Sequence, residues 1–264
     1  MTTILITGAT GGLGRHLARR LAERGDTVLA HGRDQARLDR LAKELNGADL
    51  TTYTADLSSL AEARDLAARV SAAHDRLDVL VNNAGVGFGA PGSGREPGTD
   101  GHELRWTVNY LAPVLLTRSL LPALRAAAPS RIVNVGSLGQ EGIDFDDVEL
   151  VRGYDGVTAY RRSKLALAAW TFDLAEELRP DRIAVNCLHP ATFMDTAMVT
   201  DAGVTPRSTV EEGGDAVMKL IDAPHEVTGR FFDGTHESRA HPDAYDPEVR
   251  HRLQKATTQA LEQA

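Results

Sequence analysis

The fold is decided by the stretch TTILITGATGGLGRHLARRLAER at residues 2–24. Residues 2–7 form a short β-branched run that predicts a strand, and residues 12–24 carry apolar side chains at helical spacing. Between them lies Gly8-Ala9-Thr10-Gly11-Gly12-Leu13-Gly14, whose glycines allow a tight turn and the close approach of a diphosphate to the helix start. Glycine also serves turns for steric reasons alone, so the position between first strand and first helix is what favours a nucleotide site.

A second strand and helix are predicted at residues 27–33 and 34–45. In nucleotide-binding sheets of this kind the end of the second strand contacts the adenosine ribose, with an acid for NAD or an arginine for the 2′-phosphate of NADP. That end is His31-Gly32-Arg33, with no carboxylate before Asp34, so the charge favours NADP, with NADPH preferred over NADH. A solvated Arg33 is the alternative, and Arg15 beside the glycine turn is a candidate second cation.

The rest of the chain continues this alternation. Strands are predicted at 49–55, 76–83, 131–137, 182–190 and 228–232, and helices at 58–73, 101–127, 157–179 and 210–221, with a weak helix after Pro247. Pro113 and Pro122 are expected to bend the long helix. The segments 86–101, 139–156 and 191–209 are expected to be irregular. We therefore predict the α/β fold class, a single Rossmann-fold domain over residues 1–264, with a doubly wound parallel sheet of about seven strands and helices on both faces.

Composition narrows the class of protein. The formal charge of -8 and a pI near 5.6 argue against nucleic acid as a partner, because binding it needs a clustered excess of cations. Cys187 is the single cysteine and lies in an apolar run, so we expect an inert buried thiol, no disulfide and no metal site. The amino terminus lacks a signal-peptide pattern, and residues 110–124 are too short to span a membrane. We expect a cytoplasmic protein.

Residues 137–164 carry the candidate chemistry. Tyr160 and Lys164 are four residues apart on a predicted helix, so they share one face. A nearby ammonium should lower the pKa of the phenol, which could then act as a general acid or base. Ser137 ends a buried strand, where such sheets place their ligands, and could donate a hydrogen bond to a substrate oxygen. A solvated tyrosine–lysine surface pair is the alternative.

Taken together, these motifs resemble the short-chain dehydrogenase/reductase family over nearly the whole chain. The matching motifs stand in the family's order and are TGATGGLG at 7–14, Asp56-Leu57, Asn82-Asn83-Ala84-Gly85, Asn109, and Ser137 with Tyr160-Arg161-Arg162-Ser163-Lys164. The residues in and around these motifs are similar to those of the retinol-dehydrogenase-like and carbonyl-reductase-like members. The resemblance implies an oxidoreductase of the carbonyl reductase or alcohol dehydrogenase class, a ketoreductase in the reducing direction.

The resemblance also implies a role for each matched residue. Tyr160 would donate or remove the proton, Ser137 would hold the substrate oxygen, Lys164 would bind the nicotinamide ribose and lower the tyrosine pKa, and Asn109 would hold a proton-carrying water. The implied cofactor-binding set is Gly8, Thr10, Gly11, Gly12, Leu13, Gly14, Arg33, Asp56, Leu57, Asn83, Ala84, Gly85, Tyr160, Lys164, Pro190, Thr192 and Thr196. Family members often pair through the catalytic helix and its neighbour, so a homodimer or homotetramer is one expectation.

Two departures from the family pattern stand out. Ser137 and Tyr160 are about twice as far apart as is usual, so residues 139–156 form an insertion whose acids are Glu141, Asp144, Asp146, Asp147 and Glu149. A solvated loop face is favoured over a contact with a cationic substrate. Pro190-Ala191 replaces the usual proline-glycine, which leaves Thr192 and Thr196 as contacts to the carboxamide, the latter with the better spacing. We expect His189 to be satisfied locally, and Phe88, Phe193, Met194 and Met198 either line an apolar pocket or serve as lid and core.

Three hypotheses for the function follow. The first is an NADP-dependent oxidoreductase acting on a small-molecule ketone or aldehyde, or on the corresponding alcohol. The second keeps the bound cofactor for redox-neutral chemistry, such as epimerisation or dehydration. The third is a non-catalytic NADP sensor. Because such silent relatives typically lose the tyrosine or the lysine, the intact Ser137, Tyr160 and Lys164 favour the first.

Overall fold

The computed structural model describes residues 1–90 and 92–262. Pro91 of the 86–101 segment and the last two residues of the predicted 1–264 domain lie outside the described residues. One eight-stranded sheet runs in the order β3-β2-β1-β4-β5-β6-β7-β8 through the part of the chain that the structure describes. Its strands are β1 Thr3–Ile6, β2 Thr27–Gly32, β3 Leu50–Thr54, β4 Val79–Asn82, β5 Ser130–Val135, β6 Ile183–His189, β7 Arg230–Asp233 and β8 His236–Ser238.

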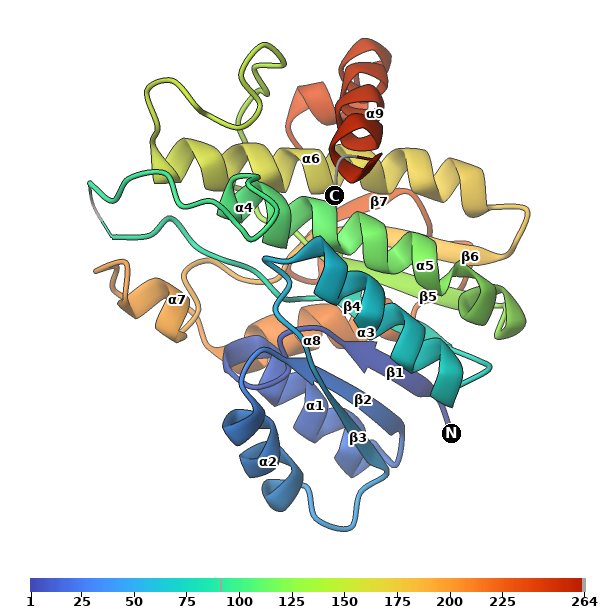
Figure 1. Cartoon of the computed structure of the whole chain (residues 1–264). Coiled ribbons are helices and arrows are strands. Elements are labelled where there is room, and N and C mark those ends of the chain that lie inside the picture. The colour runs from blue at the N-terminus through green and yellow to red at the C-terminus, as the bar shows by residue number, and fades with distance from the viewer. Residues whose placement is uncertain (91, 263–264) are drawn as a thin grey trace.

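Helices cover both faces of this sheet (Figure 1). On one face lie α1 (Gly12–Arg24), α2 (Gln35–Glu44) and α8 (Val210–Ile221), packed on Ile4 and Ile6 of β1. On the other face lie α3 (Leu60–Ala73), α5 (Ala112–Ala126) and α6 (Gly156–Leu178), packed on Leu5. Neighbouring residues of one strand therefore enter opposite cores, as expected for a parallel sheet buried on both sides. The predicted α/β doubly wound class is confirmed.

The structure adds short elements that the sequence analysis did not predict. The eighth strand, β8, pairs antiparallel with β7, whereas β1 to β7 are all parallel to their neighbours. The helix α7 (Ala197–Thr200) lies inside the segment expected to be irregular, and the 3₁₀ turn η2 spans Pro242–Tyr245. A strand of three residues or a single helical turn gives no periodicity to detect, because only its tertiary partners fix it.

The long helix predicted at 101–127 is divided. It begins with α4 (Leu104–Trp106), continues through the π-helical turn η1 (Thr107–Leu111) and only then becomes α5. Pro113 follows the π turn, and Pro122 lies within α5 without ending it. Pro113 has no N–H for the carbonyl of Asn109, which fits the change to i→i−5 bonding, since Ala112 N–H donates to the Thr107 carbonyl.

The carboxyl-terminal helix α9 (Pro247–Glu262) is fully formed and lies outside α6 (Figure 1). Its buried residues are Leu253, Thr257 and Ala260. Within the described ranges 1–90 and 92–262, none of the helices is both long and apolar enough to cross a membrane.

Candidate active site

The glycine turn between β1 and α1 is packed too tightly for side chains. Gly8 has φ +69° and Gly12 has φ +47°, both in the left-handed region that favours glycine. A β-carbon on Gly14 would lie 2.1 Å from the Gly8 carbonyl oxygen and 2.6 Å from Asn83 Nδ2. Gly14 is therefore required because the backbone that follows β1 passes directly over the first turn of α1.

The end of β4 holds this turn in place. The Thr7 hydroxyl oxygen accepts hydrogen bonds from the N–H groups of Asn83 and Ala84, both at 2.9 Å. Asn83 Nδ2 donates to the carbonyl of Thr7 at 2.8 Å and to that of Gly8 at 3.3 Å. Asn83 and Ala84, which follow β4 directly, are thus held against the turn.

The start of α1 fits a diphosphate. Gly11 is the N-cap residue, makes no side-chain capping bond, and the first turn of the helix carries no acid. A β-carbon on Gly11 would meet nothing within 4 Å. An uncapped helix start keeps free N–H groups and a positive dipole end, which is where nucleotide phosphates bind.

The other predicted cofactor contacts fall into two groups. Thr196 lies against the turn, with its methyl carbon 2.9 Å from the β-carbon position of Gly12, whereas Thr192 Oγ1 is 3.0 Å from His189 Nε2. His189 is therefore satisfied locally, as predicted. The side chains of Leu13 and Leu57 are buried in the two cores, so only their backbones can face a ligand.

The adenosine end of the predicted site contains several cations. An open pocket of about 440 Å³ is lined by Thr10, Arg15, Arg37, Arg40, Leu41 and Glu44. Arg15 is paired there with Glu44, with Nη2 2.6 Å from Oε2. Arg33 is exposed, and in the described part of the chain its guanidinium has no hydrogen bond or ion pair. Asp56 Oδ1 accepts from the Ser58 N–H at 2.9 Å, which shapes the turn after β3.

His31 ties three strand ends together at this edge, a role that the sequence analysis missed. Its Nδ1 accepts a hydrogen bond from the Gly8 N–H at 3.2 Å, and its Nε2 donates to the Ala55 carbonyl at 3.0 Å. Burial lowers the pKa of His31 to about 4, although the bond to Ala55 acts in the opposite direction. The ring is therefore neutral at physiological pH, with the proton on Nε2. A histidine at the end of a buried strand, beside the glycine turn, was the available signal.

This geometry predicts a pH dependence of stability. The folded pKa of about 4 lies below the ordinary 6.5, so the unfolded chain binds the proton first as the pH falls. The stabilisation is complete above pH 6.5 and is lost between pH 6.5 and 4, by roughly 3 kcal/mol. Urea unfolding at pH 7 and pH 5 should show a larger loss for the wild type than for His31→Gln. Equal losses would contradict the role given to His31.

Ser137, Tyr160 and Lys164 lie close together at the carboxyl end of β5. A β-carbon on Gly139 would lie 3.4 Å from Ser137 Oγ and 3.9 Å from Tyr160 Cε1, so hydroxyl and ring flank one point. Lys164 Nζ donates to the Val135 carbonyl at 2.8 Å and lies 5.7 Å from the centre of the Tyr160 ring. Residues from β5 and from one face of α6 therefore converge.

The predicted direction of the tyrosine pKa shift was wrong for this structure. Burial raises the pKa of Tyr160, and a hydrogen bond with the Ser137 side chain only opposes that rise. The Lys164 ammonium, directed to Val135, does not reverse it. Burial also lowers the pKa of Lys164 to about 8. Helical spacing gives the shared face correctly but cannot give the degree of desolvation, which the surrounding elements determine.

Asn109 is buried in the π turn, and its side chain is fully bonded to protein. Its Oδ1 accepts from the Val86 N–H at 2.7 Å, and its Nδ2 donates to the Val86 carbonyl and to Ser163 Oγ, both at 3.0 Å. Ser163 Oγ in turn donates to the Tyr160 carbonyl at 2.7 Å. Gly85 packs beside this group, since its β-carbon position lies 3.3 Å from Asn109 Oδ1 and 3.7 Å from Lys164 Nζ.

The acids of the insertion have partners within the chain. Glu149 contacts Arg95 at 2.9 Å and His102 at 2.6 Å, and accepts from the Glu103 N–H. Burial raises the pKa of Glu149, but its bonds, that to His102 foremost, outweigh this and the net shift is downward. The other four make turns or ion pairs, with Arg161, Arg152 and Arg252 among the partners of Glu141, Asp147 and Asp146. The prediction of a solvated loop face is therefore wrong for Glu149, whose contacts join the insertion to residues 95–103.

Of the apolar candidates, Phe88 packs on Tyr160. Its ring meets that of Tyr160 edge to face, with 4.8 Å between centroids. Met198 is 41% exposed and packs on Gly87, whose β-carbon position is 2.8 Å from its Cγ. Cys187 is buried and free, and burial raises its pKa to about 12, which agrees with an inert thiol.

Comparisons with known proteins agree with this geometry. The family model described as short chain dehydrogenase matches residues 2–206. The chain is similar to retinol dehydrogenase 13 from Homo sapiens, with 34% identity over 274 residues, which cover 95% of this chain and 82% of that protein.

Solved structures are similar over most of the chain. The structure of NADPH-bound carbonyl reductase from chicken fatty liver aligns with a TM-score of 0.71 and 26% identity, over 91% of this chain and 99% of that one. The structure of 3-ketoacyl-(acyl-carrier-protein) reductase from Brucella melitensis complexed with NADH gives a TM-score of 0.71 and 26% identity, over 88% and 96%.

Proposed function

This chain belongs to the short-chain dehydrogenase family, and we propose that it is an NADP-dependent oxidoreductase that transfers hydride between NADPH and the carbonyl carbon of a ketone or aldehyde, or from the corresponding alcohol in reverse. The observation that carries the proposal is that Ser137, Tyr160 and Lys164 lie close together at the end of β5. They lie next to Gly85 in the loop after β4, and a hydrogen bond joins that loop to the glycine turn. These three polar side chains and the glycine turn, where a dinucleotide would bind, therefore lie at the same edge of the sheet.

The protein's own residues would handle the proton and the substrate oxygen. Bound NADPH would supply the hydride. Tyr160, whose pKa is raised, stays protonated at neutral pH and can donate its proton to the oxygen of a carbonyl. Ser137 Oγ accepts from the Gly139 N–H at 3.0 Å, which leaves its own O–H to donate to the same oxygen. Two donors directed at one oxygen stabilise the negative charge that develops there.

Lys164 and Asn109 would have supporting roles beside Tyr160 and Ser137. The ammonium uses one hydrogen for the Val135 carbonyl, so its remaining donors can hold ribose hydroxyls. The side chain of Asn109 is occupied by Val86 and Ser163, so a proton-carrying water would bind its backbone carbonyl instead. That carbonyl lacks an α-helical partner because Pro113 has no N–H.

The preference for NADPH rests on charge at the end of β2. Arg33 is exposed and unpaired in the described residues, Arg37 and Arg40 line the neighbouring pocket, and Arg15 is held there by Glu44. An additional phosphate is favoured among such cations, whereas a ribose hydroxyl prefers an acid.

Arg33→Ala tests the cofactor preference. We expect the Kd for NADPH, measured by its fluorescence, to rise by about tenfold or more, because a charged hydrogen bond contributes about 1.5 to 3 kcal/mol. The Kd for NADH should change less than threefold. Arg19→Ala, which removes an exposed arginine of α1, is the matched control. Equal losses for both cofactors would contradict the 2′-phosphate role.

The activity itself is tested with the purified chain. NADPH binding is measured first by fluorescence, and turnover is then followed as loss of nicotinamide absorbance with a panel of ketones and aldehydes. We expect both. Binding without any turnover would favour the non-catalytic alternative, and conversion of substrate with no net loss of absorbance would favour redox-neutral chemistry.

The expected homodimer or homotetramer and the cytoplasmic location stay predictions. One feature of the fold bears on pairing: α9 and η2 pack on α6, where Tyr245 stacks on Phe172 at 4.7 Å and Arg250 pairs with Asp173 at 3.1 Å. Pairing of two chains through this face of α6 would require α9 to move, so we propose that any dimer uses another surface.

A further inference from the structure

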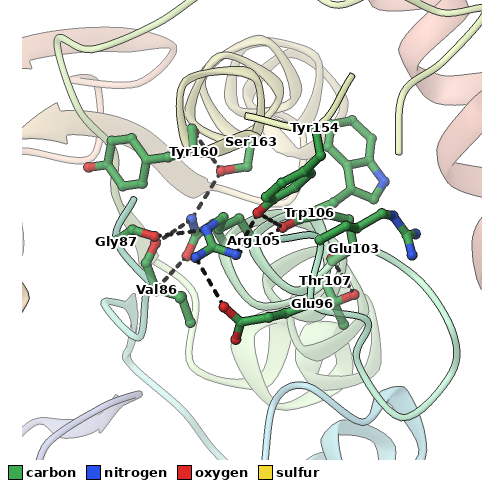
Figure 2. Close-up of polar contacts among 12 residues, drawn as sticks. Val86, Gly87, Glu96, Glu103, Arg105, Trp106, Thr107, Tyr154, Tyr160 and Ser163 are labelled. Atoms are coloured by element: carbon green, nitrogen blue, oxygen red, sulfur yellow. Dashed lines mark hydrogen bonds and ion pairs between the residues drawn. The ribbon is translucent and has the colours of Figure 1, made fainter. Parts of the chain in front are cut away.

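Arg105 of α4 is an arginine buried in a position that the proposed chemistry does not use. Its side chain is 1% exposed. Nε donates to the Gly87 carbonyl at 2.9 Å, and Nη1 donates to Glu103 Oε1 at 3.2 Å and to the Tyr154 hydroxyl at 2.7 Å. Figure 2 shows the guanidinium between these groups. Glu96 Oε1 lies 3.8 Å from Nη2 of the same guanidinium.

These bonds join three segments that are far apart in sequence. Gly87 belongs to the loop after β4, Glu103 precedes α4, and Tyr154 belongs to the insertion before α6. The Tyr154 hydroxyl also donates to Glu103 Oε1 at 3.0 Å, so the three side chains form a closed triangle. Glu103 Oε2 accepts from the Trp106 N–H at 2.7 Å and fixes the triangle to the helix.

The loop that Arg105 holds is the one that contacts the reactive tyrosine. Phe88 follows Gly87 directly, and its ring packs edge to face on Tyr160 at 4.8 Å. On its other side the Phe88 carbonyl abuts α6, since a β-carbon on Gly156 would lie 2.1 Å from that oxygen. Residues 83–89 form no regular element, so side-chain bonds have to fix their backbone.

We propose that Arg105 is a positioning residue, which with Glu103 and Tyr154 holds Gly87 and Phe88 so that the Tyr160 ring keeps one orientation. A guanidinium suits this task because its rigid planar fork directs several donors at fixed angles. The inference rests on the proposed function only for its catalytic readout. Its structural readout can be measured without cofactor or substrate.

Arg105→Gln is the first test. We expect kcat for carbonyl reduction to fall at least tenfold, because Phe88 and Tyr160 lose their fixed geometry, while the Kd for NADPH changes less than twofold. Since removing one member of a buried ion pair can prevent folding, the double variant Glu103→Gln/Arg105→Gln is measured beside it. That variant leaves no unpaired buried charge and should show the same loss of kcat.

A titration of Tyr160 distinguishes a positioning role of Arg105 from a purely structural one. Phenolate absorbance is recorded against pH for each protein and for its Tyr160→Phe counterpart, and the difference isolates Tyr160. Because burial is what raises this pKa, a loosened Phe88 should let water in and shift the titration toward 10, the ordinary value.

Arg250→Gln is the matched control, because Arg250 is 17% exposed and pairs with Asp173 and Glu176 on the far side of α6. It should lower stability without changing kcat or the Tyr160 titration. If the Arg105 variants lose only stability, as the control does, the inference is overturned. If the wild type reduces no compound of the panel, the proposed function fails, yet the titration still decides whether Arg105 positions Tyr160.

Discussion

Replacing Tyr160 with phenylalanine is expected to lower kcat for carbonyl reduction by about a thousandfold while the Kd for NADPH stays within about twofold, because a positioned general acid contributes a factor of about 10² to 10⁴. Only the hydroxyl is removed, and the ring still packs against Phe88. Stopped-flow or steady-state loss of nicotinamide absorbance measures kcat, and NADPH fluorescence measures binding. Turnover that persists in this variant would exclude Tyr160 as the proton donor.

The same residue predicts how the two directions of the reaction respond to pH. The pKa of Tyr160 is raised, so the phenol is protonated through neutral pH and reduction should be flat there and fall only in alkaline solution. Oxidation of an alcohol needs the phenolate, so its rate should rise with pH over the same range. Loss of the Lys164 charge above its pKa of about 8 should weaken ribose binding in both directions. A rate of oxidation that rises with pH where the rate of reduction is still flat is the expected result.

Ser137→Ala is the control within the same site. It removes one hydrogen-bond donor to the substrate oxygen and keeps the proton source, so a smaller loss is expected, about a hundredfold in kcat. If Ser137→Ala were as damaging as Tyr160→Phe, the two hydroxyls would act as one unit, and the separate roles given to them would have to be revised.

Replacing Gly14 with alanine is expected to destabilise the fold by about 3 kcal/mol or more and to abolish detectable NADPH binding. The added methyl group would lie 2.1 Å from the Gly8 carbonyl oxygen and 2.6 Å from Asn83 Nδ2. Both groups are held in place, because Asn83 Nδ2 donates hydrogen bonds to the carbonyls of Thr7 and Gly8. The turn must therefore open, and urea unfolding without cofactor measures the loss.

Gly11→Ala separates steric crowding from ligand contact in the same turn. Gly11 has φ -159°, an extended backbone that any residue adopts, and its β-carbon position meets nothing within 4 Å. We expect its free energy of unfolding to remain within about 0.5 kcal/mol of the wild type. A loss of NADPH affinity at unchanged stability would place the diphosphate over Gly11. Equal destabilisation by Gly11→Ala and Gly14→Ala would contradict the packing argument.

Much of the fold could be predicted from the sequence because its signals are local. The β-branched run at 2–7, the glycines after it and the helical spacing at 12–24 each depend on residues next to one another. Repetition of that unit predicted a parallel sheet with two buried faces. The antiparallel β8 and the single turn α7 were missed because their tertiary partners decide them. Pro113 predicted a bend, but not that the backbone before it would form the π turn at Thr107–Leu111.

The amino-acid sequence by itself determined that Tyr160 and Lys164 share a helical face, because 3.6 residues per turn bring positions four apart together in any surroundings. The tertiary structure alone decided that the Tyr160 pKa is raised, that His31 joins three strand ends, and that Arg105 reaches Gly87 and Tyr154. These last contacts join residues 18 and 49 positions apart. No local pattern encodes them, because desolvation and long-range hydrogen bonds exist only once separate segments have packed against each other.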